Sequence, residues 1–360
     1  VENGDDGDSF NYSPPRKDLE VFSNKSECSV EVSGSDIYDQ AEIHFDMVVP
    51  ADLDERAEGK VSVTMLVDMT VALRKDSKVI DFNVKVDNKG LSHRLCVLFD
   101  SQIVSAFNYA DQQFGLIKRP NYYEKEMKLY MESMNNKTEK KAGIQELANW
   151  ANDQSTWQEP PISIEPTQSY VSLTDGKTGI AVIPQGVREY EVLDDSKIRL
   201  TLFRTYGFMG KENLIYLPGR ASGERIIETP AAQLLKEMEF NFGFTSYAGD
   251  INDSDIDTLA KQYNTNLEVY TYAEFLNGRL IFSQREIEGQ NAKIHSLFET
   301  EGNLVVSAVK KAEEDDGYII RLYNGKDHKD LDDKIKFNFD IKEAYYTNLK
   351  EEKTEEIKVE

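Results

Sequence analysis

Alternation of apolar and polar residues is the commonest pattern in this chain of 360 residues. Residues 61–73 carry an apolar side chain at every second position, and after a turn at 74–78 the alternation resumes over 80–86. Successive side chains of a strand point to opposite faces, so each segment predicts a strand with one buried face. Together they predict an antiparallel hairpin. The continuous apolar run at 95–99 predicts a more central strand.

One segment breaks this β pattern. Tyrosine and methionine recur at helical spacing over 123–134, and a second helical stretch follows near 143–151. We therefore expect a helical excursion over 121–155. Its methionine and aromatic stripe is a candidate ligand groove, although packing onto the sheet is the favoured interpretation. Further strands are predicted over 179–183, 189–193 and 198–203.

The composition turns polar and acidic over 248–262, after which strand patterns resume. Domain boundaries fall in polar linkers, so we place one there. The predicted fold is all-β. A large, multi-stranded, antiparallel and supersandwich-like β-sandwich occupies 1–247, including the helical excursion, and a smaller β-sandwich occupies 263–360. The later strands are predicted over 267–275, 304–309, 318–323 and 335–341.

The charge balance is strongly acidic. Lysine and arginine number 42 against 65 aspartates and glutamates, which gives a formal net charge of -23 at pH 7. This charge repels phosphate backbones and anionic lipids, so we expect neither nucleic acid nor a membrane as a partner. No uncharged run approaches the roughly 20 residues of a membrane-spanning helix, and the first residues do not have the pattern of a secretion signal. We expect a cytoplasmic protein whose own amino terminus lies upstream.

Candidate catalytic and metal-binding residues are scarce. The four histidines are far apart and form no metal-binding motif, so each is interpreted as a structural or surface residue. Cys28 and Cys96 allow at most one disulfide, and the apolar run around Cys96 favours a buried free thiol. Residues 250–257 resemble a calcium loop only in acidity, because Asp255 and Lys261 stand where glycine and a bidentate glutamate belong. We assign no catalytic residue, metal ligand or cofactor to this chain.

Residues 4–15 read GDDGDSFNYSPP and combine glycine, aspartate and aromatic residues. Carboxylates accept hydrogen bonds from vicinal hydroxyls, and aromatic faces stack on C–H surfaces, so such a loop can suit a sugar. The alternative is a flexible, solvated terminus. Composition alone favours that alternative.

Several motifs follow one another along the chain. Residues 4–14 fit the pattern GD-x-GD-x-F-x-Y-SP, residues 93–99 read HRLCVLF, and 113–115 with 119–120 read QFG and RP. In order and spacing, nearly the entire chain resembles the carboxyl-terminal β-sandwich half of bacterial-type α-mannosidases of glycoside hydrolase family 38. That family usually has arginine where Cys96 stands. Further matches are QSYV at 168–171, GIAV at 179–182, EYEV at 189–192, KKAE at 310–313, IRLYN at 320–324 and the longer stretch 187–233.

The resemblance implies a retaining glycosidase mechanism. An aspartate forms a glycosyl-enzyme intermediate, a second carboxylic acid protonates the leaving group, and zinc binds sugar hydroxyls. In the family all of these groups belong to the preceding domain. We therefore expect zinc in a catalytic domain outside this chain and carry none of these residues over.

The resemblance also implies a supporting role, since the β-sandwich of the family packs on the catalytic domain and lends side chains to the rim of the sugar site. Phe10 stands where relatives carry a tyrosine that can reach the bound mannose. The guanidinium groups of Arg204 and Arg220 could hold sugar hydroxyls or form an interdomain ion pair. The candidate substrate-binding residues are Asp6, Asp8, Phe10, Tyr12, Arg204 and Arg220.

We therefore expect the non-catalytic carboxyl-terminal portion of a retaining, zinc-dependent α-mannosidase, which supports and completes a sugar site built elsewhere. Its partners would be its own catalytic domain and an α-mannoside, and the fragment alone should be inactive. One alternative is a stand-alone carbohydrate-binding β-sandwich that stacks sugars on Trp157, Tyr122 or Tyr123. Another is a module for subunit contacts in a homo-oligomer.

Overall fold

The computed structural model describes residues 1–137, 159–217, 226–268, 296–302, 304–326, 330 and 334–359. The chain divides into two compact units, Val1–Tyr263 and Asn264–Glu360. Strands dominate the described residues of both units, and the sheets are antiparallel. The predicted all-β class is confirmed.

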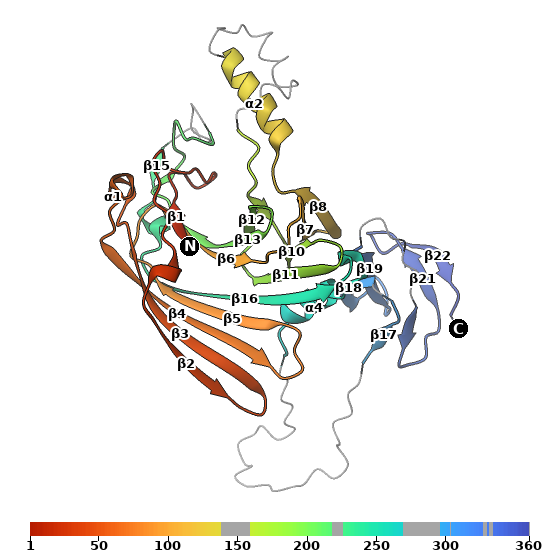
Figure 1. Ribbon diagram of the computed structural model, residues 1–360. Coiled ribbons are helices and arrows are strands. Elements are labelled where there is room, and N and C mark those ends of the chain that lie inside the picture. The colour runs from red at the N-terminus through yellow and green to blue at the C-terminus, as the bar shows by residue number, and fades with distance from the viewer. Residues whose placement is uncertain are drawn as a thin grey trace, which may run out of the picture. The chain divides into compact units, whose positions relative to one another are not determined.

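The first unit contains a nine-stranded and a five-stranded sheet (Figure 1). A short pair, β14 (Phe208–Met209) and β15 (Ile227–Glu228), stands apart from them. In spatial order the nine strands are β2 (Cys28–Gly34), β3 (Tyr38–Val49), β4 (Val63–Arg74), β5 (Ile80–Asp87), β16 (Glu237–Ala248), β11 (Thr178–Gln185), β10 (Val171–Thr174), β7 (Phe107–Gln112) and β8 (Gly115–Pro120). The five are β1 (Glu2–Gly4), β6 (His93–Asp100), β13 (Lys197–Arg204), β12 (Glu189–Leu193) and β9 (Glu165–Pro166).

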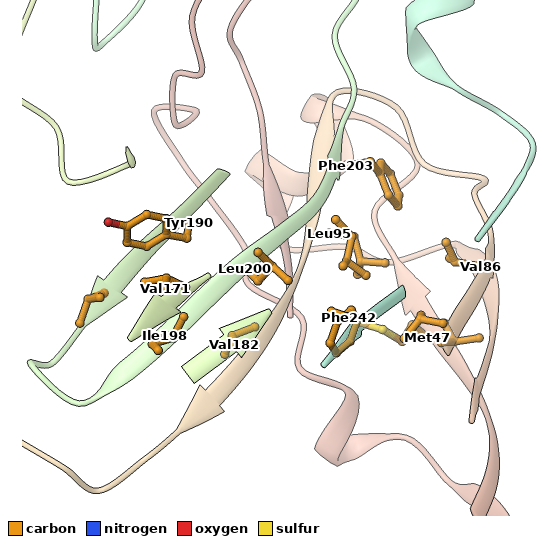
Figure 2. Packing of buried hydrophobic residues seen from close by; sticks show 14 of the residues in the cluster. Met47, Val86, Leu95, Val171, Val182, Tyr190, Ile198, Leu200, Phe203 and Phe242 are labelled. Carbon is orange, nitrogen blue, oxygen red and sulfur yellow. The ribbon is translucent and has the colours of Figure 1, made fainter. Parts of the chain in front are cut away.

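The core lies between the facing sides of these two sheets. Met47 and Phe242 project from the larger sheet and Leu95 and Leu200 from the smaller one, and all four belong to one buried cluster (Figure 2). Strands β4 and β5 form the predicted hairpin, and β6 lies between β1 and β13 as the predicted central strand. Alternation predicts these elements because only one face of each strand is buried.

The opposite face of the nine-stranded sheet carries a second apolar cluster. The 3-10 helix η4 (Ile251–Asp253) buries Ile251 in this cluster, and helix α4 (Ile256–Tyr263) buries Ile256 and Ala260 there, together with Ala181 of β11. The acidic segment at 248–262, which sequence analysis treats as the linker between domains, contains both helices. The structure assigns this segment to the first unit, because its apolar residues belong to that unit's second cluster.

Two further α-helices lie among the described residues of the first unit. Helix α2 (Glu124–Lys137) falls within the predicted excursion over 121–155, whose residues 138–155 lie outside the described part of the chain. From the tyrosine and methionine stripe of α2, Tyr130 is buried and Met131 is exposed. Helix α1 (Leu53–Glu58) has no counterpart in the sequence analysis.

The second unit consists of two-stranded antiparallel sheets in its described residues. The predicted strands 304–309 and 318–323 are confirmed, whereas 335–341 shortens to three residues and most of 267–275 lies outside the described residues. The pairs are β17 (Phe298–Thr300) with β20 (Ile335–Phe337), β18 (Leu304–Lys311) with β19 (Tyr318–Asn324), and β21 (Ala344–Thr347) with β22 (Lys353–Ile357).

Candidate functional site

Residues 5–13, called the first loop below, follow β1 at the edge of the smaller sheet. Near one end of the loop an amide donates to the Ser92 carbonyl at 2.9 Å, and in its middle another donates to the Phe208 carbonyl at 3.1 Å. The side chains of Asp5 and Asp8 are completely buried. The solvated terminus expected from composition is therefore wrong for this loop, because hydrogen bonds and burial hold it in place.

The aspartates of the two Gly-Asp pairs, Asp5 and Asp8, act in the same way. The Asp5 carboxylate accepts from the Gly7 amide at 2.9 Å, and the Asp8 carboxylate accepts from the Phe10 and Asn11 amides at 2.8 Å. An aspartate that accepts from a backbone N–H two residues further on stabilises a tight turn. A Cβ on Gly7 would lie 2.0 Å from the Asn11 carbonyl oxygen, so this approach of backbone to backbone requires glycine.

Arg204, the last residue of β13, fills the centre of the first loop. Its Nε and Nη2 lie 2.6 and 3.1 Å from the two carboxylate oxygens of Asp5, and Nη2 also donates to the carbonyls of Asp8 and Asn11 at 2.9 Å. Burial raises the pKa of the Asp5 carboxyl, and the contacts with Arg204 act in the opposite direction. A bidentate guanidinium both stabilises the buried carboxylate and fixes its geometry. In this structure Arg204 shapes the loop.

Lys211 holds the first loop from outside. Its amide donates to the second carboxylate oxygen of Asp8 at 2.9 Å, and its ammonium forms an ion pair with Asp6. Both oxygens of Asp8 therefore accept protein donors. Asp6 and Lys211 each keep more than a quarter of their side chain exposed, and Phe10 is 60% exposed. The loop thus offers a solvent-accessible carboxylate and an aromatic ring.

Tyr12 is the buried aromatic residue of the first loop. Its hydroxyl accepts from Asn3 Nδ2 at 3.0 Å, and the Arg94 guanidinium lies 4.1 Å from the centroid of its ring. The ring of Tyr216 meets it edge-on at 6.0 Å. Burial raises the pKa of the Tyr12 phenol, which keeps the hydroxyl protonated.

Two arginines on the outer face of the smaller sheet share one carboxylate. Glu191 accepts from Arg94 at 2.7 Å and from Arg199 at 3.4 Å, and Arg199 also pairs with Glu20 at 3.0 Å. Both arginines are more than nine-tenths buried. Among the described residues, Nη1 of Arg94 and Nε of Arg199 make no hydrogen bond. Nη1 of Arg94 lies 3.8 Å from a carboxylate oxygen of Glu189, within ion-pair but not hydrogen-bond distance.

Two adjoining pockets open beside these residues. The smaller, of about 240 Å³, is lined by Phe10 and Arg204, and the larger, of about 350 Å³, is lined by Arg94 and Arg199. Donors, carboxylate acceptors and aromatic faces meet in a concave site of sugar size, which suits a neutral polyhydroxylated ligand. The residues that line both pockets are Tyr12, Ile162, Ile164 and Tyr216.

The structure brings most of the predicted substrate-binding residues to one place. Asp6, Asp8, Phe10 and Tyr12 lie in the first loop and Arg204 contacts it, whereas Arg220 lies outside the described residues.

Of the three aromatic residues of the alternative stacking platform, two lie among the described residues. Tyr122 lines the larger pocket, and the Tyr123 hydroxyl donates to Glu165 at 2.5 Å. Trp157 lies outside the described residues.

Sequence reasoning missed Asp5, Lys211 and Arg94. Asp5 has a signal, because it belongs to the first of two identical Gly-Asp pairs, and the structure uses both pairs alike. Arg94 and Lys211 have no such signal in the sequence. Their partners lie 97 and 205 residues away in the sequence, at Glu191 and Asp6.

In the described part of the chain, no group of three or more His, Cys, Asp and Glu side chains could hold a metal ion. These residues therefore provide no binding site for the zinc that the resemblance implies. Cys28 and Cys96 are both free, and burial raises the pKa of the Cys96 thiol. The described helices include none that is long and apolar enough to cross a membrane.

The fold is similar to that of two solved structures. A family 38 glycosyl hydrolase from Enterococcus faecalis superposes with a TM-score of 0.68 and 19% identity, covering 93% of this chain and 35% of that one. An α-mannosidase from Enterococcus faecalis V583 superposes with a TM-score of 0.66 and 19% identity, covering 90% and 33%. Identities this low show a shared fold only.

Sequence comparison shows the family. The family 38 C-terminal domain of glycosyl hydrolases matches residues 1–208, and the family 38 C-terminal beta sandwich domain matches residues 303–360. The chain belongs to glycoside hydrolase family 38, to its carboxyl-terminal region. A putative mannosylglycerate hydrolase from Halalkalibacterium halodurans is 23% identical over 343 residues, which cover 90% of this chain and 32% of that protein. The chain spans about a third of the length of the relatives it matches.

Proposed function

We propose that this chain is the carboxyl-terminal part of a retaining, zinc-dependent α-mannosidase and that it completes the sugar site of a catalytic domain outside these residues. The family match and the resemblance to solved α-mannosidases support this assignment. The observation that carries it is the first loop, a hydrogen-bonded turn that places Phe10 in the lining of a pocket of about 240 Å³ and leaves the Asp6 carboxylate partly exposed. The partners are the protein's own catalytic domain and an α-mannoside.

The loop residues have different roles in this proposal. Asp8 and Arg204 are positioning residues, because their polar atoms bind the backbone of the loop itself. Asp6 can exchange its exposed lysine partner for a sugar hydroxyl, and the Phe10 ring can stack on the C–H face of a sugar. Phenylalanine has no hydroxyl, so Phe10 contributes contact area and no polar contact. Zinc and the catalytic carboxylates belong to the other domain.

The decisive experiment measures kcat/KM for an aryl α-mannoside in the full-length protein. Asp6→Asn and Phe10→Ala should each lower kcat/KM by about 10- to 100-fold, if their contacts strengthen in the transition state, without changing the melting temperature. Asp8→Asn should lower the melting temperature as well, because its carboxylate accepts three backbone N–H groups.

Matched controls come from exposed residues elsewhere in the first unit. Asp36→Asn changes a fully exposed carboxylate beside β2, and Phe114→Ala removes an exposed ring at the β7–β8 turn. Both should keep full activity. Wild-type kcat/KM in both Asp6→Asn and Phe10→Ala would refute the loop's role in the sugar site.

The 360-residue chain by itself should not hydrolyse α-mannosides, and added zinc should change nothing. Zinc-dependent turnover by the purified chain would contradict the proposal. Calorimetric titration with mannosides distinguishes the alternative, since a stand-alone carbohydrate-binding module would bind them without the catalytic domain.

A further inference from the structure

Strand β2 (Cys28–Gly34) is an edge strand of the nine-stranded sheet, and all seven of its residues are exposed (Figure 1). One side pairs with β3 without interruption, from Cys28 opposite Phe45 to Gly34 opposite Asp39. In the described part of the chain no strand pairs with its other side. Among the described residues, its outer row of backbone N–H and C=O groups therefore has no partner strand.

The core face of the sheet continues onto this strand. Val30 lies opposite Ile43, which lies opposite Met69, so the three side chains are on one face. That face is the core face, because Met69 packs against the main cluster. Yet Val30 is 53% exposed and Val32 79%, whereas Met47 on the same face of β3 is 2% exposed. The smaller sheet covers only part of this apolar face.

The edge also lacks the features that prevent strands from pairing with other chains. Soluble proteins protect exposed edges with proline, lysine, bulges or charges on the buried face. Residues 28–34 read CSVEVSG, contain neither proline nor lysine, and pair with β3 without a bulge. The single charge, Glu31, lies on the other face from Val30. An open edge joined to an uncovered apolar face indicates a partner.

We propose that β2 pairs with β2 of a second copy of this chain, in an antiparallel ladder about a two-fold axis at Val30. An antiparallel edge is self-complementary under a two-fold axis, and the alternation of faces requires the axis to pass through a residue. With the axis at Val30, Cys28 lies opposite Val32 of the partner subunit. Ser29 then lies opposite Glu31 of the partner subunit.

Electrostatics select this register over its neighbours. An axis at Glu31 would place the two Glu31 carboxylates opposite each other, and an axis at Ser29 would place Glu27 opposite Glu31 of the partner subunit. Like charges directly opposite destabilise a sheet. An axis at Val32 would oppose Val30 to Gly34 of the partner subunit and lose an apolar pair. Only the axis at Val30 places every apolar residue of the strand opposite an apolar residue of the partner strand.

The net charge of the chain predicts how the dimer responds to salt. Two copies with a formal net charge of -23 repel one another, and the repulsion between exposed charges is screened over about 8 Å at 0.15 M salt. Apolar contacts do not weaken with added salt. Association through β2 should therefore strengthen between about 0.05 and 0.5 M sodium chloride, as the Debye length shortens.

Sedimentation of the 360-residue chain tests the association, with a doubled mass expected at the higher salt concentration. Val30→Glu places two carboxylates opposite each other and should weaken dimerisation by about tenfold or more. The control is Val48→Glu, at a comparably exposed valine of β3 on the face opposite the core. It should dimerise as wild type does. A monomeric wild type, or a Val30→Glu variant that dimerises normally, overturns the proposal.

Disulfide capture tests the register. In a Cys28→Ser background, Val30→Cys places two thiols directly opposite each other and should form a covalent dimer on mild oxidation. Ser29→Cys in the same background is the control, because its two thiols would be offset by two residues along the strand, beyond the reach of a disulfide. Equal yields of covalent dimer from both variants, or none from either, contradict the axis at Val30.

Val30→Cys should also form the covalent dimer in the full-length protein. Failure there would show that another part of the polypeptide covers β2, and would overturn the proposal.

Discussion

Asp5 and Asp6 are neighbours in the sequence but have opposite environments. The Asp5 carboxylate is completely buried and forms a bidentate pair with Arg204, whereas Asp6 pairs with Lys211 where both side chains remain partly exposed. When a buried carboxylate loses its charge, the guanidinium beside it is left without a counter-charge in surroundings that solvate ions poorly. An exposed ion pair, in contrast, contributes little to the free energy of unfolding. The two positions should therefore differ in their effect on stability.

We predict that Asp5→Asn lowers the free energy of unfolding by about 3 kcal/mol, at the lower end of the range for broken buried pairs. The lower end applies because Arg204 keeps the carbonyls of Asp8 and Asn11 as acceptors. Asp6→Asn should change it by less than about 1 kcal/mol. Denaturant unfolding of both variants beside wild type measures the difference. Equal losses at the two positions would contradict this interpretation of the loop.

At the scale of the element, the sheet is held by cross-strand pairs that alternation alone does not specify. His44 of β3 lies opposite Asp68 of β4, and its Nδ1 is 2.6 Å from the carboxylate. The hydrogen bond to Asp68 raises the pKa of His44 above its ordinary value near 6.5, and the neighbouring Glu31 and Glu42 act in the same direction. A raised pKa means that folding favours the protonated ring.

The pair should therefore stabilise the sheet below the ordinary pKa, and this contribution should be lost as pH rises through the raised value. We predict an NMR titration midpoint for His44 above 6.5, and a return toward 6.5 in Asp68→Asn. The resonances of His44 report this directly because the side chain is exposed. An unchanged midpoint in the variant would show that Asp68 is not the cause.

Short elements depend on capping, which sequence analysis by periodicity overlooks. Helix α1 has only six residues, but Asp52 accepts from the amides of Asp54 and Glu55 at 3.0 Å, and Gly59 ends the helix at a φ of 71°. An aspartate before a helix and a glycine after it are both readable signals. The helix was missed because six residues are too few for an apolar period.

At the scale of the whole molecule, the boundary between units depends on α4. The helix lies in an acidic segment, but it buries Ile256 and Ala260 against the nine-stranded sheet. A fragment of residues 1–247 would therefore expose the second apolar cluster, whereas a fragment of residues 1–263 keeps it covered. Fully burying an isoleucine contributes roughly 1.5–3 kcal/mol, so losing Ile251 and Ile256 matters.

We predict that the fragment 1–263 unfolds cooperatively at a higher temperature than 1–247, and that 1–247 associates through its exposed cluster. Calorimetry and size-exclusion chromatography of the two fragments measure both effects. The two fragments differ in residues 248–263, which contain the last residue of β16 together with η4 and α4. Equal melting temperatures would mean that these helices contribute no stability to the sheet.

The sequence by itself determined the hairpin of β4 and β5 and which of its faces is buried, because alternation with a period of two is a local property that burial on one side imposes. It also marked the first loop, since two Gly-Asp pairs and two aromatic residues stand together within a dozen positions. These signals need no knowledge of the rest of the chain.

Only the tertiary structure decided which groups the loop uses and which it leaves open. Asp5 meets Arg204 across 199 residues, and Arg94 meets Glu191 across 97. In a chain with 65 acidic and 42 basic side chains, composition cannot select these pairs among the many possible ones. Strand order places the partners side by side, and it depends on long-range packing. The same packing leaves β2 with an open edge and a partly covered apolar face.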